Sequence, residues 1–442
     1  MSTIVEQVPE ESGDMVAAHR RHMFPWVKPY YAEPVVAREA EGVWLRDVQG
    51  VEYLDLFAGI LTTSLGHCHP RVVGRAAEQA RRLGHTSTLY ITEAQVEAAE
   101  RLTALTPAGL ERVCFTNSGT EAVEAAITAA CLYTARSEVI ALRLAYSGRS
   151  LLSTNLTGHA GWRPLPSGVA GIKHARAPYI YRSPLGPDAS EERHTDFFID
   201  DLVEVIETTT TGRPAALIVE TIQGVGGFIV PPSGYLERAA EVIRSYGGLY
   251  IADEVQTGFG RTGRHWFGVG HWGVEPDVMV MAKGIANGAP VGATVARDEV
   301  ADAWTGLSIS TFGGNPVSMA AASATMEVMV EEDVPARAAE RGAQLRAGLE
   351  RLRGDHPWIG EVRGMGLMQA LEIVEDRDAP RPDPARARAL LEAARAERVL
   401  VGLGGQSGHV VRMGPSLLIT AEEVDEGLAR LGRACRRAGE PS

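Results

Sequence analysis

The sequence predicts an α/β fold with a mostly parallel central sheet, on the basis of its length, its composition and its hydrophobic pattern. With 442 residues, the chain is long enough for two or three domains, or for one large α/β unit with a smaller one appended. Its 45% hydrophobic and 22% charged residues are typical of a globular protein. Short continuous apolar runs alternate with helical segments from about Gly59 to Met326, which indicates a sheet buried on both faces.

The pattern divides the chain into three segments. Residues 1–58 carry short alternating stretches, such as Tyr53–Leu56, and are expected to form a β-rich part of a small domain. Residues 327–442 are rich in Ala, Arg and Glu, with strand candidates at Gly364–Glu372 and Val410–Thr420, and predict a small C-terminal α/β domain. Residues 59–326 are expected to form the large domain, whose predicted strands are Val113–Thr116, Val139–Leu142, Leu217–Glu220, Leu249–Asp253, Val278–Ala282 and Gly292–Ala296.

The charge and the cysteines argue against several classes of function. A formal net charge of −13 disfavours nucleic acid and anionic membranes as partners. Residues 1–15 lack the apolar core of a signal peptide, and no apolar run is long enough to cross a bilayer. The four cysteines are scattered, without disulfide or zinc spacing, so we expect a reducing, cytoplasmic location and no metal.

One predicted strand leads into a helix start that could bind phosphate. After Phe115, the residues Ser118, Gly119 and Thr120 open a helical segment. Ligands of open α/β sheets bind at the carboxyl ends of the strands, and a helix start offers free N–H groups and the positive end of the helix dipole. An ordinary helix N-cap has the same pattern, so this signal is weak by itself.

Asp253 and Lys283 close two further apolar runs. A carboxylate at a buried strand end needs a cationic partner, and a protonated pyridine nitrogen is one; a salt bridge or a helix cap is the alternative. Burial lowers the pKa of a lysine and frees its amine for Schiff-base formation, unless the side chain reaches the surface instead. Together, the phosphate cradle, the acid and the lysine indicate pyridoxal phosphate better than any of them does alone.

Two motifs suggest other ligands and are rejected. Gly258–Gly263 fits the G-x-G-x-x-G pattern of dinucleotide-binding proteins, but the residues that follow do not start a helix. His67–Pro70 resembles a metal motif but has no partner cluster at zinc spacing, so a turn is the better interpretation.

On the motifs that contain these residues, the chain resembles the class III aminotransferases (ω-aminotransferases), which are fold-type I pyridoxal-phosphate enzymes. The resemblance runs from about residue 30 to residue 420. It implies a large cofactor-binding domain, a small domain formed by both chain ends, and a homodimer with active sites at the interface. Its most specific stretches are Gly66–Pro70, Phe115–Ala122, Ile251–Gly263, Pro276–Ile285 and Thr311–Pro316.

The resemblance implies two catalytic residues, Lys283 as the Schiff-base lysine and proton shuttle, and Asp253 as the partner of the pyridinium nitrogen. It also implies that Arg412 binds the substrate carboxylate, a task that suits a bidentate guanidinium. The other residues implied to bind the cofactor are Ser118, Gly119 and Thr120 at the phosphate, Tyr146 on the ring face, Glu220 near the site, Gln256 at the ring hydroxyl, and Thr311 at the phosphate of the neighbouring subunit's cofactor.

Several positions depart from the family pattern. Ser147 follows the stacking aromatic where the family usually has His, which removes an aromatic, titratable neighbour of the cofactor. Val225 stands where many members carry a Glu that can pair with Arg412, and in this the chain is similar to the alanine–glyoxylate aminotransferase branch. Thr221 and Ser416 each replace a common proline.

The implied reaction is transamination between an amino donor, either an amino acid or an amine, and a 2-oxo acid acceptor, through a Lys283 aldimine. The alternative is that the same fold and cofactor serve racemisation or epimerisation, or γ-elimination and replacement with C–C bond formation on a substrate such as a sulfonium amino acid. Ser147 leaves that alternative open. A nicotinamide-dependent dehydrogenase based on Gly258–Gly263 and a non-catalytic binding protein are further alternatives. The sequence does not identify the substrate.

Overall fold

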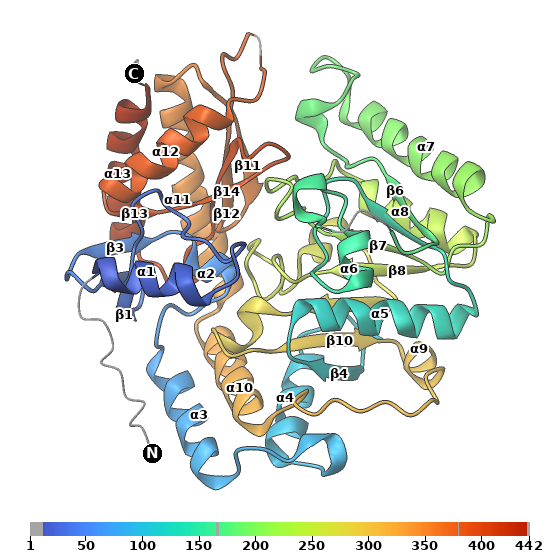
Figure 1. Cartoon of the computed structure of the whole chain (residues 1–442). Helices are drawn as coiled ribbons and strands as arrows, with labels where there is room; N and C mark the ends of the chain where they lie inside the picture. The colour runs from blue at the N-terminus through green and yellow to red at the C-terminus, as the bar shows by residue number, and fades with distance from the viewer. Residues whose placement is uncertain (1–11, 165–167, 379, 440–442) are drawn as a thin grey trace.

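The computed structural model describes residues 12–164, 168–378 and 380–439. A seven-stranded sheet with the order β4-β10-β9-β8-β7-β5-β6 forms the centre of the larger lobe (Figure 1). Only β10 runs antiparallel to its neighbours, so the prediction of a mostly parallel sheet is confirmed. The strands are β4 (Arg112–Thr116), β5 (Val139–Leu142), β6 (Ile172–Ala175), β7 (Ala216–Glu220), β8 (Leu249–Asp253), β9 (Val278–Met281) and β10 (Gly292–Ala296).

Both faces of this sheet are buried, which explains the continuous apolar runs. Alternate residues of each strand enter two separate cores: Ile218 and Val280 pack in the core that includes α5, and Leu217 and Met279 in the core on the other face. The α-helices are α1 (Ser12–His22), α2 (Ala58–Leu61), α3 (Pro70–Arg82), α4 (Glu93–Thr103), α5 (Gly119–Thr134), α6 (Leu151–Leu156), α7 (Glu191–Thr209), α8 (Tyr235–Ser245), α9 (Asp298–Asp302), α10 (Pro316–Glu331), α11 (Val334–Asp355), α12 (Pro384–Ala396) and α13 (Ala421–Gly439). The 3-10 helices are η1 (Ser87–Leu89), η2 (Ala160–Trp162), η3 (Ile180–Arg182), η4 (Gly268–Trp272) and η5 (Lys283–Ala286).

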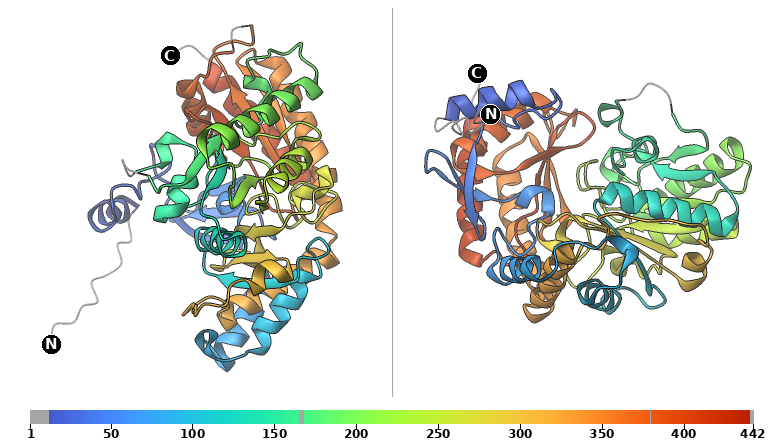
Figure 2. Two further views of the ribbon diagram at one scale, coloured as in Figure 1. Left: turned by 90° about the vertical axis from the view of Figure 1, so that its right-hand side faces the viewer. Right: turned by 60° about the horizontal axis from the view of Figure 1, so that its bottom comes forward.

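Elements from the N-terminal and C-terminal parts of the described chain lie together in a second lobe beside the first (Figures 1 and 2). Its two four-stranded sheets have the orders β1-β2-β3-β13 and β11-β12-β15-β14. Strand β13 pairs in parallel with β3, with Val399 opposite Leu54, so residues about 345 positions apart are neighbours. This pairing supports a small domain that is built from the N-terminal and C-terminal parts of the chain. The domain boundaries at residues 58 and 326 stay a prediction. The strands are β1 (Ala37–Glu41), β2 (Trp44–Asp47), β3 (Glu52–Asp55), β11 (Ile359–Met365), β12 (Met368–Ile373), β13 (Val399–Leu400), β14 (Gly402–Gly404) and β15 (Val410–Met413).

Two strand predictions in the C-terminal segment are wrong in their extent. The predicted strand Gly364–Glu372 is a hairpin, because Gly366 turns the chain with a φ of 52° between β11 and β12. A side chain at that glycine would lie 2.5 Å from the backbone of Thr262, so only glycine fits there. The predicted strand Val410–Thr420 ends at Met413, shortly before Pro415, which has no N–H to donate to a ladder.

The short element α2 is an unusual left-handed turn. Its four residues Ala58, Gly59, Ile60 and Leu61 have φ values of 48°, 60°, 67° and 59°. Left-handed backbone costs about 1–2 kcal/mol for each residue other than glycine. The carboxylate of Asp55 supports the turn by accepting hydrogen bonds from the N–H groups of Phe57 and Ala58. Strain of this kind is typical of functional sites, and the turn leads from β3 toward the candidate site.

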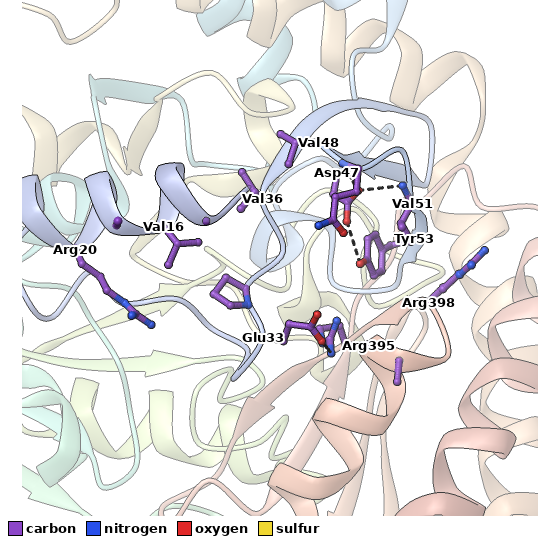
Figure 3. A pocket seen from close by; sticks show the side chains of 15 residues that line it. Val16, Arg20, Glu33, Val36, Asp47, Val48, Val51, Tyr53, Arg395 and Arg398 are labelled. Atoms are coloured by element: carbon purple, nitrogen blue, oxygen red, sulfur yellow. Dashed lines mark hydrogen bonds and ion pairs between the residues drawn. The ribbon is translucent and has the colours of Figure 1, made fainter. Parts of the chain in front are cut away.

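A cavity of about 570 Å³ lies in the smaller lobe between α1, the turn from β2 to β3 and the end of α12 (Figure 3). Its acidic side chains are engaged within the fold. Asp47 accepts hydrogen bonds from the Val51 N–H and the Tyr53 hydroxyl, and Glu33 pairs with Arg395. None of the predicted site residues lines this cavity. No helix in the described part of the chain has both the length and the apolar character needed to cross a bilayer.

Candidate active site

Three ionisable side chains meet at the carboxyl ends of neighbouring strands. Glu220 ends β7, Asp253 ends β8, and the two are paired in the parallel register of these strands. Lys283 begins η5 two residues after the end of β9, the next strand of the sheet. The sheet therefore places one amine and two carboxylates at one edge, where ligands of α/β folds bind.

Lys283 has the environment that its position predicts. Burial lowers the pKa of its amine, while Asp253 and Glu220 act in the opposite direction and Arg412 adds to the lowering. The residue is only partly exposed, and its φ of 47° places a non-glycine residue in the left-handed region. A lysine with a lowered pKa is more often the free amine, which is the form that attacks carbonyl groups.

The two carboxylates differ in how much of their hydrogen-bonding capacity is used. Glu220 accepts hydrogen bonds from the N–H groups of Tyr146 at 2.9 Å and Gly224 at 2.8 Å, one on each oxygen. Asp253 accepts one, from the N–H of Val255 at 3.0 Å. Burial raises the pKa of both side chains. A cation placed beside Asp253 would lower its pKa again, so this acid is the one suited to a positively charged ligand atom.

The start of α5 offers free donors beside the lysine. Ser118 is the N-cap, and its hydroxyl accepts the N–H of Glu121 at 3.2 Å. The N–H groups of Gly119 and Thr120 find no acceptor within the described segments. A Cβ at position 119 would lie 3.3 Å from the Cβ of Ala282, the residue before the lysine, so glycine suits this close packing. The ordinary N-cap and the anion site therefore coexist here, with two free N–H groups at the positive end of the helix.

Gln256 completes this group. Its side chain is buried, and its Oε1 has no hydrogen-bond partner in the described part of the chain. A Cβ on Gly224 would lie 2.3 Å from the Gln256 amide, so glycine is needed for this packing. Buried acceptors are normally satisfied, and an unpaired one beside a cluster of site residues indicates a ligand donor.

These groups fit pyridoxal phosphate. The amine of Lys283 matches an aldehyde, and the carboxylate of Asp253 matches a protonated ring nitrogen. The orphaned Oε1 of Gln256 can accept from a ring hydroxyl, and the free N–H groups of α5 can bind a phosphate. The assignment of each residue to its atom remains a prediction.

Arg412 is a buried cation held by backbone oxygens. Its Nε and Nη2 donate to the carbonyl of Leu403 at 3.1 and 2.7 Å, and its Nη1 donates to that of Gly224 at 2.9 Å. Burial lowers its pKa to about 10. No carboxylate among the described residues forms an ion pair with it. Since a guanidinium has five donors, one remains on each terminal nitrogen, which is what a bidentate carboxylate requires.

Two aromatic side chains that no sequence motif indicated lie beside this arginine. The guanidinium carbon lies 5.3 Å from the ring centre of Phe57 and 5.4 Å from that of Phe228. Cations are stabilised at such distances over aromatic rings. The hydroxyl of Tyr30, at the far end of the chain, accepts the N–H of Leu403. No local pattern could have revealed these contacts, because they join residues from four separate segments of the chain.

Tyr146 and Thr311 lie differently from the other predicted residues. Tyr146 is half-buried, is tied to Glu220 through its N–H, and packs edge-to-face on Trp162 with ring centres 5.5 Å apart. Thr311 lies in an exposed segment, and its side chain forms no hydrogen bond within the described segments of this chain. The predicted role of Thr311 requires a second subunit.

Ser147 is buried where the family pattern has His. Its N–H donates to the hydroxyl of Thr157 at 3.1 Å, and that hydroxyl donates to the carbonyl of Ser153 at 3.0 Å. The backbone of this loop is therefore tied to the hydroxyl of Thr157, the C-cap residue of α6, and not through an aromatic side chain. The structure contains no titratable group at this position.

The two rejected motifs have structural roles. Gly260 and Gly263 both have a φ of 79°, and a Cβ on either would lie about 3.0 Å from backbone atoms of α11. These glycines therefore allow close packing rather than opening a helix toward a dinucleotide. His67 pairs with Asp55 at 2.9 Å in a turn where Cys68 has a φ of 52°. No group of three or more His, Cys, Asp or Glu side chains in the described part of the chain could hold a metal ion.

Comparisons with known proteins agree with this geometry. The family model "Aminotransferase class-III" matches residues 27–435. The mitochondrial alanine–glyoxylate aminotransferase 2 homolog 2 of Arabidopsis thaliana is 38% identical over 416 residues, 94% of this chain and 86% of that protein. The acetylornithine aminotransferase of Methanothermobacter thermautotrophicus is 37% identical over 427 residues, 96% of this chain and 98% of that protein. The crystal structure of an amine transaminase from an uncultivated Pseudomonas species, in its PLP-bound form, has a TM-score of 0.89 at 32% identity and covers 95% of this chain and 99% of its own.

Proposed function

The chain belongs to the class III aminotransferases, and from this we propose that its donor is an α-amino acid and its acceptor a small 2-oxo acid, each held through its carboxylate by Arg412. As a member of this family, it is a pyridoxal-phosphate enzyme that transfers amino groups. The family match and the named relatives support transamination and do not support racemisation or γ-elimination. The observation that carries the substrate proposal is the buried Arg412, which has two free donors and no acidic partner among the described residues.

Each site residue then has a defined task. When bound, the cofactor supplies a carbonyl for the amino group and a ring that withdraws electrons. Lys283 would hold the cofactor and carry the proton from the substrate α-carbon, since its lowered pKa makes the free amine available. Asp253 would keep the ring nitrogen protonated, and Gln256 would accept the ring hydroxyl. Arg412 would orient the substrate so that its α-carbon faces the amine of Lys283.

Val225 supports a site in which Arg412 binds the substrate carboxylate and no glutamate at position 225 can pair with it. Its carbonyl accepts the N–H of Gly405 at 2.9 Å, and a Cβ on the neighbouring Gly404 would lie 2.6 Å from Nε of Arg412. The valine therefore stands close to the arginine but cannot pair with it. A small oxo acid such as glyoxylate needs no second carboxylate site, which agrees with the relatives named for alanine and glyoxylate.

The Arg412→Gln variant should separate substrates with a carboxylate from those without one. We expect kcat/KM for alanine to fall roughly 10²-fold or more, because about 3 kcal/mol of charge-assisted hydrogen bonding is lost. For 1-phenylethylamine, which has no carboxylate, we expect a change of less than about threefold. Both values are measured for the first half-reaction alone, with no acceptor added, by following the absorbance of the cofactor, because an oxo acid acceptor would itself depend on Arg412.

The control for this experiment is Arg213→Gln, which removes an exposed arginine elsewhere on the surface. An equal loss with both donors would mean that Arg412 only supports the fold. An unchanged kcat/KM for alanine would contradict the substrate proposal directly.

We further propose that the protein is a homodimer, on the basis of an exposed apolar surface around Thr311. Leu307 is fully exposed, and Ile309 and Phe312 are 64% and 59% exposed. Ile91, which is 90% exposed, lies in a neighbouring segment, because the hydroxyl of Thr88 donates to the carbonyl of Ser310. Apolar side chains clustered in this way are typical of an interface between subunits. The same surface would bring Thr311 to the cofactor of the partner.

The Ile309→Glu variant should weaken this dimer. Two buried charges, one from each subunit, would raise the dissociation constant at least about a hundredfold. Analytical ultracentrifugation over a concentration series measures the change. Leu132→Glu on the exposed side of α5 is the matched control and should leave the dimer intact. A monomeric wild-type protein, or a dimer unaffected by Ile309→Glu, would contradict the proposed surface.

The cytoplasmic location also remains a proposal. All four cysteines are free thiols, which agrees with a reducing compartment. The Arabidopsis relative is named as mitochondrial, and that compartment is also compatible with free thiols.

A further inference from the structure

A second cavity, of about 460 Å³, lies at the same edge of the central sheet as the candidate active site but beside other strands. Arg143 directly follows β5 and Arg176 directly follows β6, so the cavity stands at the carboxyl ends of two parallel strands. This is where α/β sheets bind ligands. Lys283, Asp253, Glu220 and Arg412 do not line it.

The lining of this cavity is strongly basic. It includes four arginines, Arg143, Arg163, Arg176 and Arg182, and no aspartate or glutamate. A positive cavity is unexpected in a protein whose formal net charge is −13. Positive groups gathered around a concave surface concentrate anions from solution.

Two of these arginines are already paired, and two are not. Arg182 pairs with the buried Glu372, and Arg176 donates through Nε to Asp201 at 2.8 Å, which leaves its terminal nitrogens free. The side chains of Arg143 and Arg163 form no ion pair within the described segments. Both act on His174, whose pKa is lowered by burial and further by these two cations. Three guanidinium groups with free donors therefore surround the cavity.

Hydrogen bonds within the chain hold the segments that line this cavity. The segment after Arg143 is fixed by two hydrogen bonds, from the Gln223 amide to the Arg143 carbonyl at 2.9 Å and from the Leu144 N–H to the Gly158 carbonyl at 2.9 Å. Gln406 contributes an exposed amide on one side, next to Gly405, whose carbonyl is contacted by the ring of His159 at 3.3 Å. The same loop carries Leu403, which holds Arg412.

We propose that this cavity is a binding site for a small anion with two or more oxyanion groups. Guanidinium forks match carboxylate and phosphate oxygens, and several forks on different segments require an anion that can contact more than one of them. The volume admits a small organic dianion or a diphosphate. The chemistry is common to dicarboxylates and polyphosphates, and the experiment separates these two sources.

The test is a titration of the holoenzyme by isothermal calorimetry, with succinate in one arm and inorganic pyrophosphate in the other. We expect one of the two probes to bind with a dissociation constant below the millimolar range. The double variant Arg143→Gln/Arg163→Gln should weaken that binding at least about tenfold, because charge-assisted hydrogen bonds from both arginines are lost. The probe that responds identifies the class of ligand.

The matched control is Arg213→Gln/Arg351→Gln, which removes the same charge from two exposed positions that do not line the cavity. Its binding should stay within about twofold of the wild type. Equal weakening in both double variants would overturn the proposal, since only net charge would then matter. Binding that is unchanged in Arg143→Gln/Arg163→Gln would also overturn it, since the probe would then sit elsewhere, for example at Arg412. The proposal would also be overturned if neither succinate nor pyrophosphate binds.

This site stands independently of the proposed function. The double variant should keep its amino transfer with alanine and its cofactor absorbance, because neither arginine side chain forms a hydrogen bond or ion pair with the site residues in the described segments, and the Arg143 carbonyl that accepts the Gln223 amide is retained. Loss of the proposed activity in the wild type would leave the calorimetric result valid. A failure of calorimetry would leave the role of Arg412 untouched.

Discussion

Lys283→Ala is expected to lower the rate of amino transfer by at least about 10⁴-fold, the largest effect of any substitution in this chain. The residue would supply both the attachment of the cofactor and the base that moves the proton, and no other lysine can replace it. The chain has only three lysines; Lys28 is exposed near the N-terminus, and Lys173 lies on β6. The rate is measured as single-turnover conversion of alanine, followed by the absorbance of the cofactor.

Borohydride reduction sharpens this experiment. Reduction of the wild-type holoenzyme should fix the cofactor on a single peptide, the one that contains Lys283, as read by mass spectrometry. Lys173→Arg is the matched control and should keep both the label and the activity. Addition of a small free amine to Lys283→Ala should restore part of the rate, because the amine can carry the proton in place of the side chain. A label on another lysine, or a Lys283→Ala variant with normal activity, would show that the assignment is wrong.

Asp253→Asn is expected to lower kcat/KM about 10²–10⁴-fold while leaving the fold intact. Asparagine keeps the size of the side chain and can still accept the N–H of Val255, but it cannot hold a proton on the ring nitrogen. Because burial raises the pKa of Asp253, its ionised form opposes folding of the cofactor-free protein. The cofactor-free variant should therefore be at least as stable as the wild type, as measured by its Tm. Loss of activity without loss of stability identifies a residue that acts on the cofactor.

Glu254, the carboxylate next to Asp253 in the sequence, is the comparison for the Asp253→Asn variant. Glu254 is buried and accepts hydrogen bonds from the hydroxyls of Thr221 and Thr257 and from the N–H groups of Gly268 and Val269. Glu254→Gln should lower the Tm and change kcat by less than about tenfold, since its partners belong to the fold. If Asp253→Asn behaves like Glu254→Gln, losing stability and keeping its activity, then Asp253 is structural and the assignment is wrong.

Thr221 shows how a departure from the family pattern is accommodated. Where the family commonly has proline, the threonine hydroxyl donates to Glu254 at 2.8 Å, one residue beyond Asp253. This bond joins the ends of β7 and β8. Ser416, the other replaced proline, donates to the carbonyl of Ser64 at 3.2 Å and accepts the N–H of Leu418 at 3.1 Å. Both hydroxyls find partners, so neither substitution leaves a buried polar group unpaired.

The sequence by itself determined the class of fold and the placement of the reactive groups. Strands buried on both faces must be continuously apolar, so six of the seven central strands could be recognised from their runs. The missed strand β6 is an edge strand that carries Lys173 and His174, and its partly exposed residues break the apolar pattern. Because parallel strands end at one edge, side chains at the ends of separate runs were expected to converge, as Glu220, Asp253 and Lys283 do.

Tertiary structure alone decided what these groups can bind. Arg412 was visible in the sequence, but its two free donors depend on the carbonyls of Leu403 and Gly224, and its stability depends on Phe57 and Phe228. Only one of the four residues in the left-handed turn at α2 is a glycine, so the sequence gives little indication of its backbone conformation. The arginine-lined cavity joins segments about 260 residues apart, from Arg143 to Gln406. Local patterns report local backbone preference and burial, whereas hydrogen-bond partners and charge neighbours are chosen by segments that meet only after the chain has folded.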